Sequence, residues 1–121
     1  MQEVIQGRSL SNKTTDTLKW NFEMPNGVAK SPDNSKVFVG DMGLNIISCV
    51  HIKNNKIADI DKFADVSYFG KSGPDGMAVA QNGNLFVALF REGKVLVLDK
   101  NGYPLGYLNT GPKTTNFWLI D

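Results

Sequence analysis

The residues best placed to do chemistry in this chain are Asn26 and Asp75, which occupy matching turns 49 residues apart. Each follows a proline, which restricts the backbone, and precedes a glycine, which has no Cβ to crowd its neighbour. Taken singly, Pro-Asn-Gly and Pro-Asp-Gly are ordinary turn signals. Their recurrence at equivalent places favours a functional role for both side chains.

The histidine and the cysteine of the chain give weaker evidence for a catalytic or metal-binding role. The single histidine, His51, falls on a predicted strand, where we expect a solvated or hydrogen-bonded side chain, and no serine elbow is present. The single cysteine, Cys49, cannot form a disulfide within the chain, and its sequence spacing predicts neither a zinc ligand set nor a Cys/His pair. We therefore expect Cys49 to be a buried strand thiol in a reducing, cytoplasmic location.

These candidates lie within an internal repeat. Residues 25–29 (PNGVA) align with residues 74–78 (PDGMA), and residues 37–40 (VFVG) align with residues 85–88 (LFVA). Turn-forming Asp, Asn and Gly residues separate the two segments in both copies, which predicts a β-hairpin in each. Repeats of this period are typical of β-propellers.

Further strands follow each hairpin. Apolar segments at 44–52 and 94–99 predict third strands, and polar turns then lead to fourth strands at 57–60 and 105–108. Four short antiparallel strands in each repeat describe a propeller blade, and no helical period runs through the chain from residue 25 onward. The sequence predicts an all-β fold, a β-propeller fragment of about 2.5–3 four-stranded blades.

The repeat also predicts how the blades divide the chain. Residues 25–68 and 73–110 are expected to form whole blades, residues 1–24 the outer strands of a preceding blade, and residues 111–121 the inner strand of a further blade. An open arc of blades would expose strand edges, so we expect a homodimer or larger ring in which a second chain completes six blades. A truncated product with irregular strand exchange is the competing interpretation.

The inner strands of a propeller line its central channel, so the loops entering them meet at one mouth. Asn26 and Asp75 are therefore predicted to converge. Asn116 falls at the equivalent position of the partial third copy and is a candidate substrate-binding residue of the channel. Arg91, at a predicted hairpin tip, is a second candidate because it could reach a substrate carboxylate.

Charge and hydropathy limit the partners. The 13 Lys and Arg residues nearly balance the 12 Asp and Glu residues, which gives no electrostatic footprint for nucleic acid or an anionic membrane. No apolar run approaches the ~20 residues of a transmembrane helix, and the start of the chain is polar. A soluble protein without nucleic-acid or membrane partners is expected.

The repeated motifs resemble those of a known family. Residues 22–29 (FEMPNGVA) and 31–33 (SPD), then 73–79 (GPDGMAV) and 83–88 (GNLFVA), are similar to the signatures of gluconolactonases, regucalcin and related bacterial lactonases. The resemblance extends over nearly all of residues 20–121. It implies that Asn26 and Asp75 are ligands of a divalent ion and that Asp75 is also the general base.

The same resemblance implies a metal-dependent hydrolase of small-molecule lactones. Oxygen-only ligands favour Ca²⁺ or Mg²⁺, and Zn²⁺ is an alternative that the family admits. A glutamate and a further asparagine that complete the family's ligand set have no match in this chain, and a two-fold ring would instead present Asn26 and Asp75 twice. A non-catalytic interaction propeller of the NHL type and an inactive lactonase-like protein are the alternatives.

Overall fold

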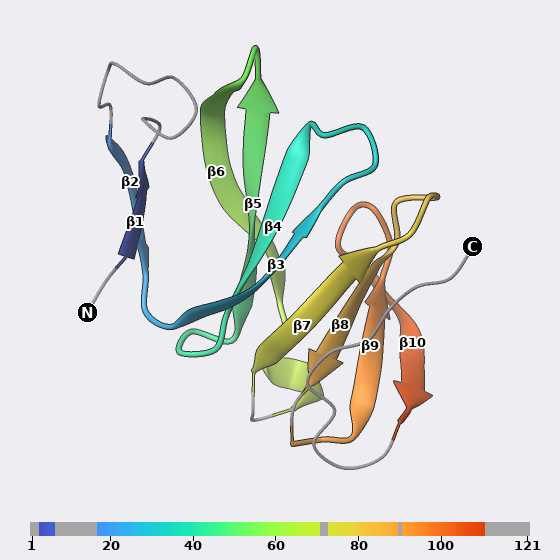
Figure 1. The fold of residues 1–121 in the computed structure, drawn as a ribbon. Coiled ribbons are helices and arrows are strands. Elements are labelled where there is room, and N and C mark those ends of the chain that lie inside the picture. Colours follow the sequence, from blue (N-terminus) through green and yellow to red (C-terminus); the bar gives the residue numbers. More distant parts are fainter. Residues whose placement is uncertain (1–2, 7–16, 71–72, 90, 111–121) are drawn as a thin grey trace.

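The computed structural model describes residues 3–6, 17–70, 73–89 and 91–110 of the chain, which form strands and one short 3₁₀ helix (Figure 1). A two-stranded antiparallel sheet, β1 (Glu3–Gln6) and β2 (Thr17–Phe22), precedes two four-stranded sheets. The 3₁₀ helix η1 (Ser67–Phe69) links the two larger sheets. The expectation of a chain built from strands is met throughout the described ranges.

The first four-stranded sheet is a simple meander of four antiparallel strands. Its order is β3 (Pro25–Lys30), β4 (Lys36–Asp41), β5 (Ile46–Lys53) and β6 (Lys56–Asp65). Lys53 pairs with Lys56 across a two-residue turn in which Asn54 and Asn55 both have positive φ, at 55° and 61°. This geometry is that of a type I′ hairpin, which asparagine tolerates because its side chain can bond locally.

The second four-stranded sheet repeats this meander. Its order is β7 (Pro74–Val79), β8 (Leu85–Leu89), β9 (Lys94–Leu98) and β10 (Pro104–Asn109). The predicted third and fourth strands are therefore present in both sheets. β6 is longer than the predicted strand at 57–60, since its pairing with β5 continues to Asp65 across two register shifts.

Two apolar clusters cover both faces of the first sheet. One lies between the two four-stranded sheets, and the other joins the opposite face to β2, where the Trp20 indole also donates a hydrogen bond to Ser48 Oγ at 3.2 Å. The sheets thus stack face to face as neighbouring layers (Figure 1). The buried members of the first cluster are Ala29, Phe38, Ile47, Cys49, Val66, Met77, Leu85, Val87, Leu89, Leu96 and Leu98, and those of the second are Phe22, Val39, Val50 and Ile60.

The first strands of the two sheets, β3 and β7, lie side by side (Figure 1). This arrangement places the turns that enter both strands near each other. None of the helices within the described ranges has the length and apolarity needed to cross a bilayer.

Candidate functional site

A buried carboxylate fixes the entry to β3, the strand that carries Asn26. Asp41, at the end of β4, is fully buried and accepts hydrogen bonds from the backbone amides of Glu23 at 2.7 Å and Met24 at 2.9 Å. The same carboxylate accepts bonds from the amides of Gly43 at 2.9 Å and Leu44 at 3.2 Å. One side chain therefore holds both the segment before Asn26 and the loop after β4.

Sequence reasoning missed this role of Asp41, although an aspartate that ends a strand before a Met-Gly turn is a typical turn acceptor. Comparison of the two repeat copies did not reveal this role. Aligning residues 37–40 with residues 85–88 places Leu89 opposite Asp41, and Leu89 is a fully buried apolar residue. The polar function is thus particular to the first sheet.

Asn26 is exposed at the start of β3. Its amide nitrogen lies 3.0 Å from the sulfur of Met42 and donates to it. Because the nitrogen is used in this way, the orientation leaves the amide oxygen as the ligand atom of the side chain. An amide oxygen is a ligand that hard divalent cations accept.

Gly27, the residue after Asn26, lies against the backbone of Asp75. A Cβ built on Gly27 would collide with the carbonyl oxygen of Asp75 and lie 3.4 Å from the Cγ of Met77. The backbones of the two turns are therefore in contact, with no side chain between them. We call the site formed by Asn26, Gly27 and Asp75 the inner-strand junction.

The carboxyl group of Asp75 is partly buried, and this desolvation raises its pKa above the usual value. A partly desolvated carboxylate and an amide oxygen, carried by neighbouring strands, are ligand types that suit a hard divalent ion, because the cation would compensate the lost hydration. The junction thus fits the type of ion that the resemblance implies. A Ca²⁺ ion takes six to eight oxygen ligands in proteins, of which the two side chains of the junction would be two.

Of the two other predicted site residues, the structure describes Arg91 but not Asn116. Arg91 is exposed and lies between β8 and β9. Because Leu89 pairs with Pro74, this turn is at the end of the second sheet where β7 begins, which is also the end that carries Asp75. Asn116 lies outside the described residues.

One prediction about Cys49 is wrong. Cys49 is buried as expected, but its thiol lies in a group with the side chains of His51 and Asp61, whose ligand atoms are all within 4.8 Å of one another. The prediction failed because sequence spacing alone does not show that Asp61 is the cross-strand partner of Cys49. The alternation of Cys49 and His51 on one strand face was the available signal.

Comparisons with known proteins agree with this architecture. The sequence pattern described as the SMP-30/Gluconolactonase/LRE-like region matches residues 7–119. Lactonase drp35 of Staphylococcus epidermidis is 31% identical over 98 residues, which make up 79% of this chain and 30% of that protein.

Solved structures give the same result. A gluconolactonase from Xanthomonas campestris superposes with a TM-score of 0.69 at 29% identity, over 83% of this chain and 32% of that one. A calcium-binding protein, regucalcin, from Agrobacterium tumefaciens superposes with a TM-score of 0.72 at 23% identity, over 85% of this chain and 36% of that one. The chain thus spans about a third of the length of these proteins. The superpositions confirm the predicted fold class, a fragment of a β-propeller with four-stranded blades.

Proposed function

Because the chain belongs to the SMP-30/Gluconolactonase/LRE-like family, we propose that it hydrolyses lactones and that the inner-strand junction is its active site. The observation that carries the proposal is the backbone contact between Gly27 and Asp75, which sets an amide and a carboxylate in adjoining turns. The relatives named as a lactonase and a gluconolactonase support the class of reaction.

Asp75 has the chemistry of the general base in this proposal. Its raised pKa makes the carboxylate a better proton acceptor than an ordinary aspartate. It takes a proton from water while the water oxygen bonds to the lactone carbonyl carbon. The ring C–O bond then breaks, and the proton passes from Asp75 to the departing ring oxygen, which yields the open hydroxy acid.

Asn26 and Asp75 are the residues that would hold a divalent ion at the junction. Such an ion supplies a Lewis acid that polarises the ester carbonyl. The amide and carboxylate oxygens favour Ca²⁺, with Mg²⁺ and Zn²⁺ as alternatives, and regucalcin is described as a calcium-binding protein. Arg91 and Asn116 are proposed to contact the substrate, Arg91 through a substrate carboxylate.

We also propose that this chain associates with further copies of itself, as a homodimer or larger ring. The first sheet packs against neighbours on both of its faces, which supports this proposal. Chains placed head to tail would give the outer blades the same cover and would bring the ligands of several copies to one channel. The molar mass in solution, measured by light scattering during gel filtration, tests this association.

Hydrolysis of glucono-δ-lactone, followed by proton release above the spontaneous rate, tests the activity. Protein treated with a chelator is assayed alone and then with Ca²⁺, Mg²⁺ or Zn²⁺. We expect ion-dependent turnover that falls about 100-fold or more in Asp75→Asn, because the base is lost. Asp59→Asn, which removes an exposed carboxylate on β6, is the matched control and should keep full activity. Equal turnover by Asp75→Asn and the native chain, or none with any ion, would refute the proposal.

A further inference from the structure

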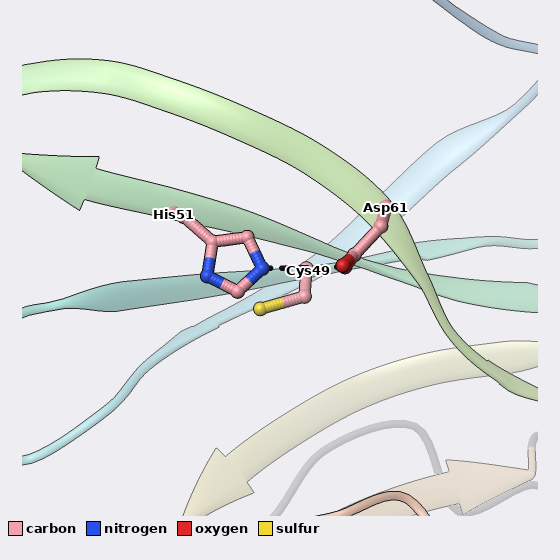
Figure 2. A group of neighbouring side chains, drawn as sticks. All are labelled: Cys49, His51 and Asp61. Atoms are coloured by element: carbon pink, nitrogen blue, oxygen red, sulfur yellow. Dashed lines mark hydrogen bonds and ion pairs between the residues drawn. The ribbon is translucent and has the colours of Figure 1, made fainter.

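A thiol, an imidazole and a carboxylate meet on the first sheet, away from the inner-strand junction (Figure 2). The ligand atoms of Cys49, His51 and Asp61 lie within 4.8 Å of one another. Cys49 and His51 are two residues apart on β5 and so share one face, and Asp61 is the register partner of Cys49 on β6. We call these three residues the Cys49 cluster.

The Cys49 cluster is separate from the candidate active site. It lies on β5 and β6, the two strands of the sheet farthest from β3 in the strand order. Along β5, Ile46 pairs with Asp41, which holds the segment before Asn26, whereas His51 pairs with Lys36 toward the other end. An ion bound by the cluster would therefore be a different ion from one at the junction.

The spacing of the ligand atoms suits a tetrahedral ion. His51 Nε2 lies 3.3 Å from Asp61 Oδ1, and Figure 2 shows the two groups facing each other. Zinc bonds of about 2.0–2.3 Å to nitrogen, oxygen and sulfur place neighbouring ligands about 3.3–3.7 Å apart in a tetrahedron. The imidazole and carboxylate already have this separation, and the thiol sulfur lies within 4.8 Å of both.

The Cys49 cluster has one buried ligand and two ligands that solvent can reach. Cys49 is 2% exposed, while the side chains of His51 and Asp61 are 36% and 59% exposed. An ion can thus enter from solvent between His51 and Asp61 and keep a water molecule as its fourth ligand. Three protein ligands with one open position form a common arrangement for zinc.

The chemistry of the ligands selects the kind of metal. Sulfur and imidazole nitrogen are soft and borderline ligands, which favour Zn²⁺ over Ca²⁺ and Mg²⁺. The junction offers only oxygen and favours the reverse. The protein therefore holds two candidate sites with opposite metal preferences.

Two charges act on the thiol. Burial, and next the carboxylate of Asp61, raise the pKa of Cys49 to about 11, while Lys36 acts in the opposite direction. Without a metal the thiol is therefore protonated and serves as core packing. When zinc binds, the S–H proton passes to solvent and the thiolate takes its place as a ligand.

Lys36 is the neighbouring cation that would oppose a bound ion, and it has room to turn away. Its side chain lines a cavity of about 250 Å³ together with Phe38, Gln81 and Lys100. The ammonium group can thus lie toward this cavity, which none of the three cluster residues lines. Asp59, the register partner of His51, adds a negative charge on the same face of the sheet.

We propose that Cys49, His51 and Asp61 bind a zinc ion with water as the fourth ligand, and that the ion ties β5 to β6. The ligands come from two neighbouring strands, so the ion would act as a clip across the outer half of the sheet. Its function is structural, and it is independent of lactone hydrolysis.

Cobalt(II) is a spectroscopic probe for this site, because a thiolate ligand gives a charge-transfer band and tetrahedral geometry gives intense visible bands. Chelator-treated native protein, kept reduced, is titrated with Co²⁺ and then with Zn²⁺. We expect a thiolate-to-cobalt band that saturates at one ion per chain and disappears when Zn²⁺ displaces the cobalt. Absence of the band would overturn the proposal.

Variants show whether all three residues act together. His51→Ala and Asp61→Ala change exposed side chains, and we expect each to weaken Co²⁺ binding by about tenfold or more. Cys49→Ala should abolish the thiolate band. Asp75→Asn should retain it, because the junction has no sulfur ligand. A band that persists unchanged in His51→Ala would show cysteine binding alone and would refute the site.

Thermal unfolding gives a second readout that does not depend on activity. Zn²⁺ should raise the melting temperature of Asp75→Asn, whose junction has lost its carboxylate, but not that of the double variant Asp75→Asn/His51→Ala, because binding to the folded state stabilises it. Loss of lactonase activity in Asp75→Asn with this shift intact would separate the two sites. An equal shift in the double variant would contradict the proposal.

Discussion

The α-carbon of Gly27 lies against the carbonyl oxygen of Asp75, so closely that a methyl group at position 27 would overlap it. The contact joins the first strands of the two sheets at the point where each carries its polar site residue. Since no side chain intervenes, backbone packing sets the distance between the two strand starts, while the Asp41 carboxylate holds the segment before Asn26. The integrity of the candidate site therefore depends on a residue that has no functional group.

Gly27→Ala tests this dependence. The added Cβ meets backbone atoms of Asp75, which cannot rotate away as a flexible side chain could. We expect a loss of about 1–3 kcal/mol in the free energy of unfolding, measured by urea denaturation, because the two strands must separate. Val28→Ala, at an exposed neighbouring position, should change this free energy by less than about 0.5 kcal/mol. Equal effects of the two substitutions would show that the contact is not tight.

Asp41 offers a second test, because its carboxylate serves four backbone amides. Asp41→Leu copies the residue at the matching position of the second sheet, Leu89, but leaves those amides without their acceptor. We expect a loss of about 3 kcal/mol or more, with a smaller loss for Asp41→Asn, which keeps one acceptor oxygen. Calorimetric or urea unfolding measures both. A leucine variant as stable as the asparagine variant would contradict this account.

Asp33 gives a prediction about pH. Hydrogen bonds from the hydroxyl and backbone amide of Ser35, and from the hydroxyl of Ser31, lower the pKa of its carboxyl group from 3.8 to about 2. Because the folded pKa is below the unfolded one, the stabilisation is present above about pH 4 and is lost as the pH falls through about 2.

The stability difference between the native chain and Asp33→Ala should therefore narrow between pH 4 and pH 2, as measured by the unfolding midpoint at each pH. Ser35→Ala is the matched control, since it removes the largest cause of the shift. An NMR titration should show a higher pKa for Asp33 in that variant. An unchanged pKa would rule out the hydroxyl of Ser35 as its cause.

The sequence was a good guide wherever its repeat was regular. The turn-forming residues at 32–35 and 81–84, between the aligned segments, predicted two hairpins, and local turn chemistry was enough because each hairpin closes over few residues. The adjacency of the matching turns at residues 25–29 and 74–78 also followed from the repeat, because equivalent strands of stacked sheets lie next to each other. Their predicted roles in metal binding and catalysis stay predictions.

Features that depend on cross-strand register were not accessible in the same way. Asp61 reaches Cys49 only because the β5–β6 pairing sets them opposite each other, and two bulges shift that register along the strands. Asp41 was hidden because the second copy has Leu89 in its place, so comparison of the copies favoured an apolar role. Both cases show side chains whose partners are chosen by tertiary structure.

The two apolar clusters on either face of the first sheet have a consequence for local opening. β4 and β5 are interior strands of this sheet and contribute buried residues to both clusters, whereas every residue of β10 is exposed. Separation of one neighbouring sheet would leave the backbone amides of β4 and β5 protected by the other. Their hydrogens should therefore exchange with solvent more slowly than those of β10, which can fray from its edge without disturbing either layer.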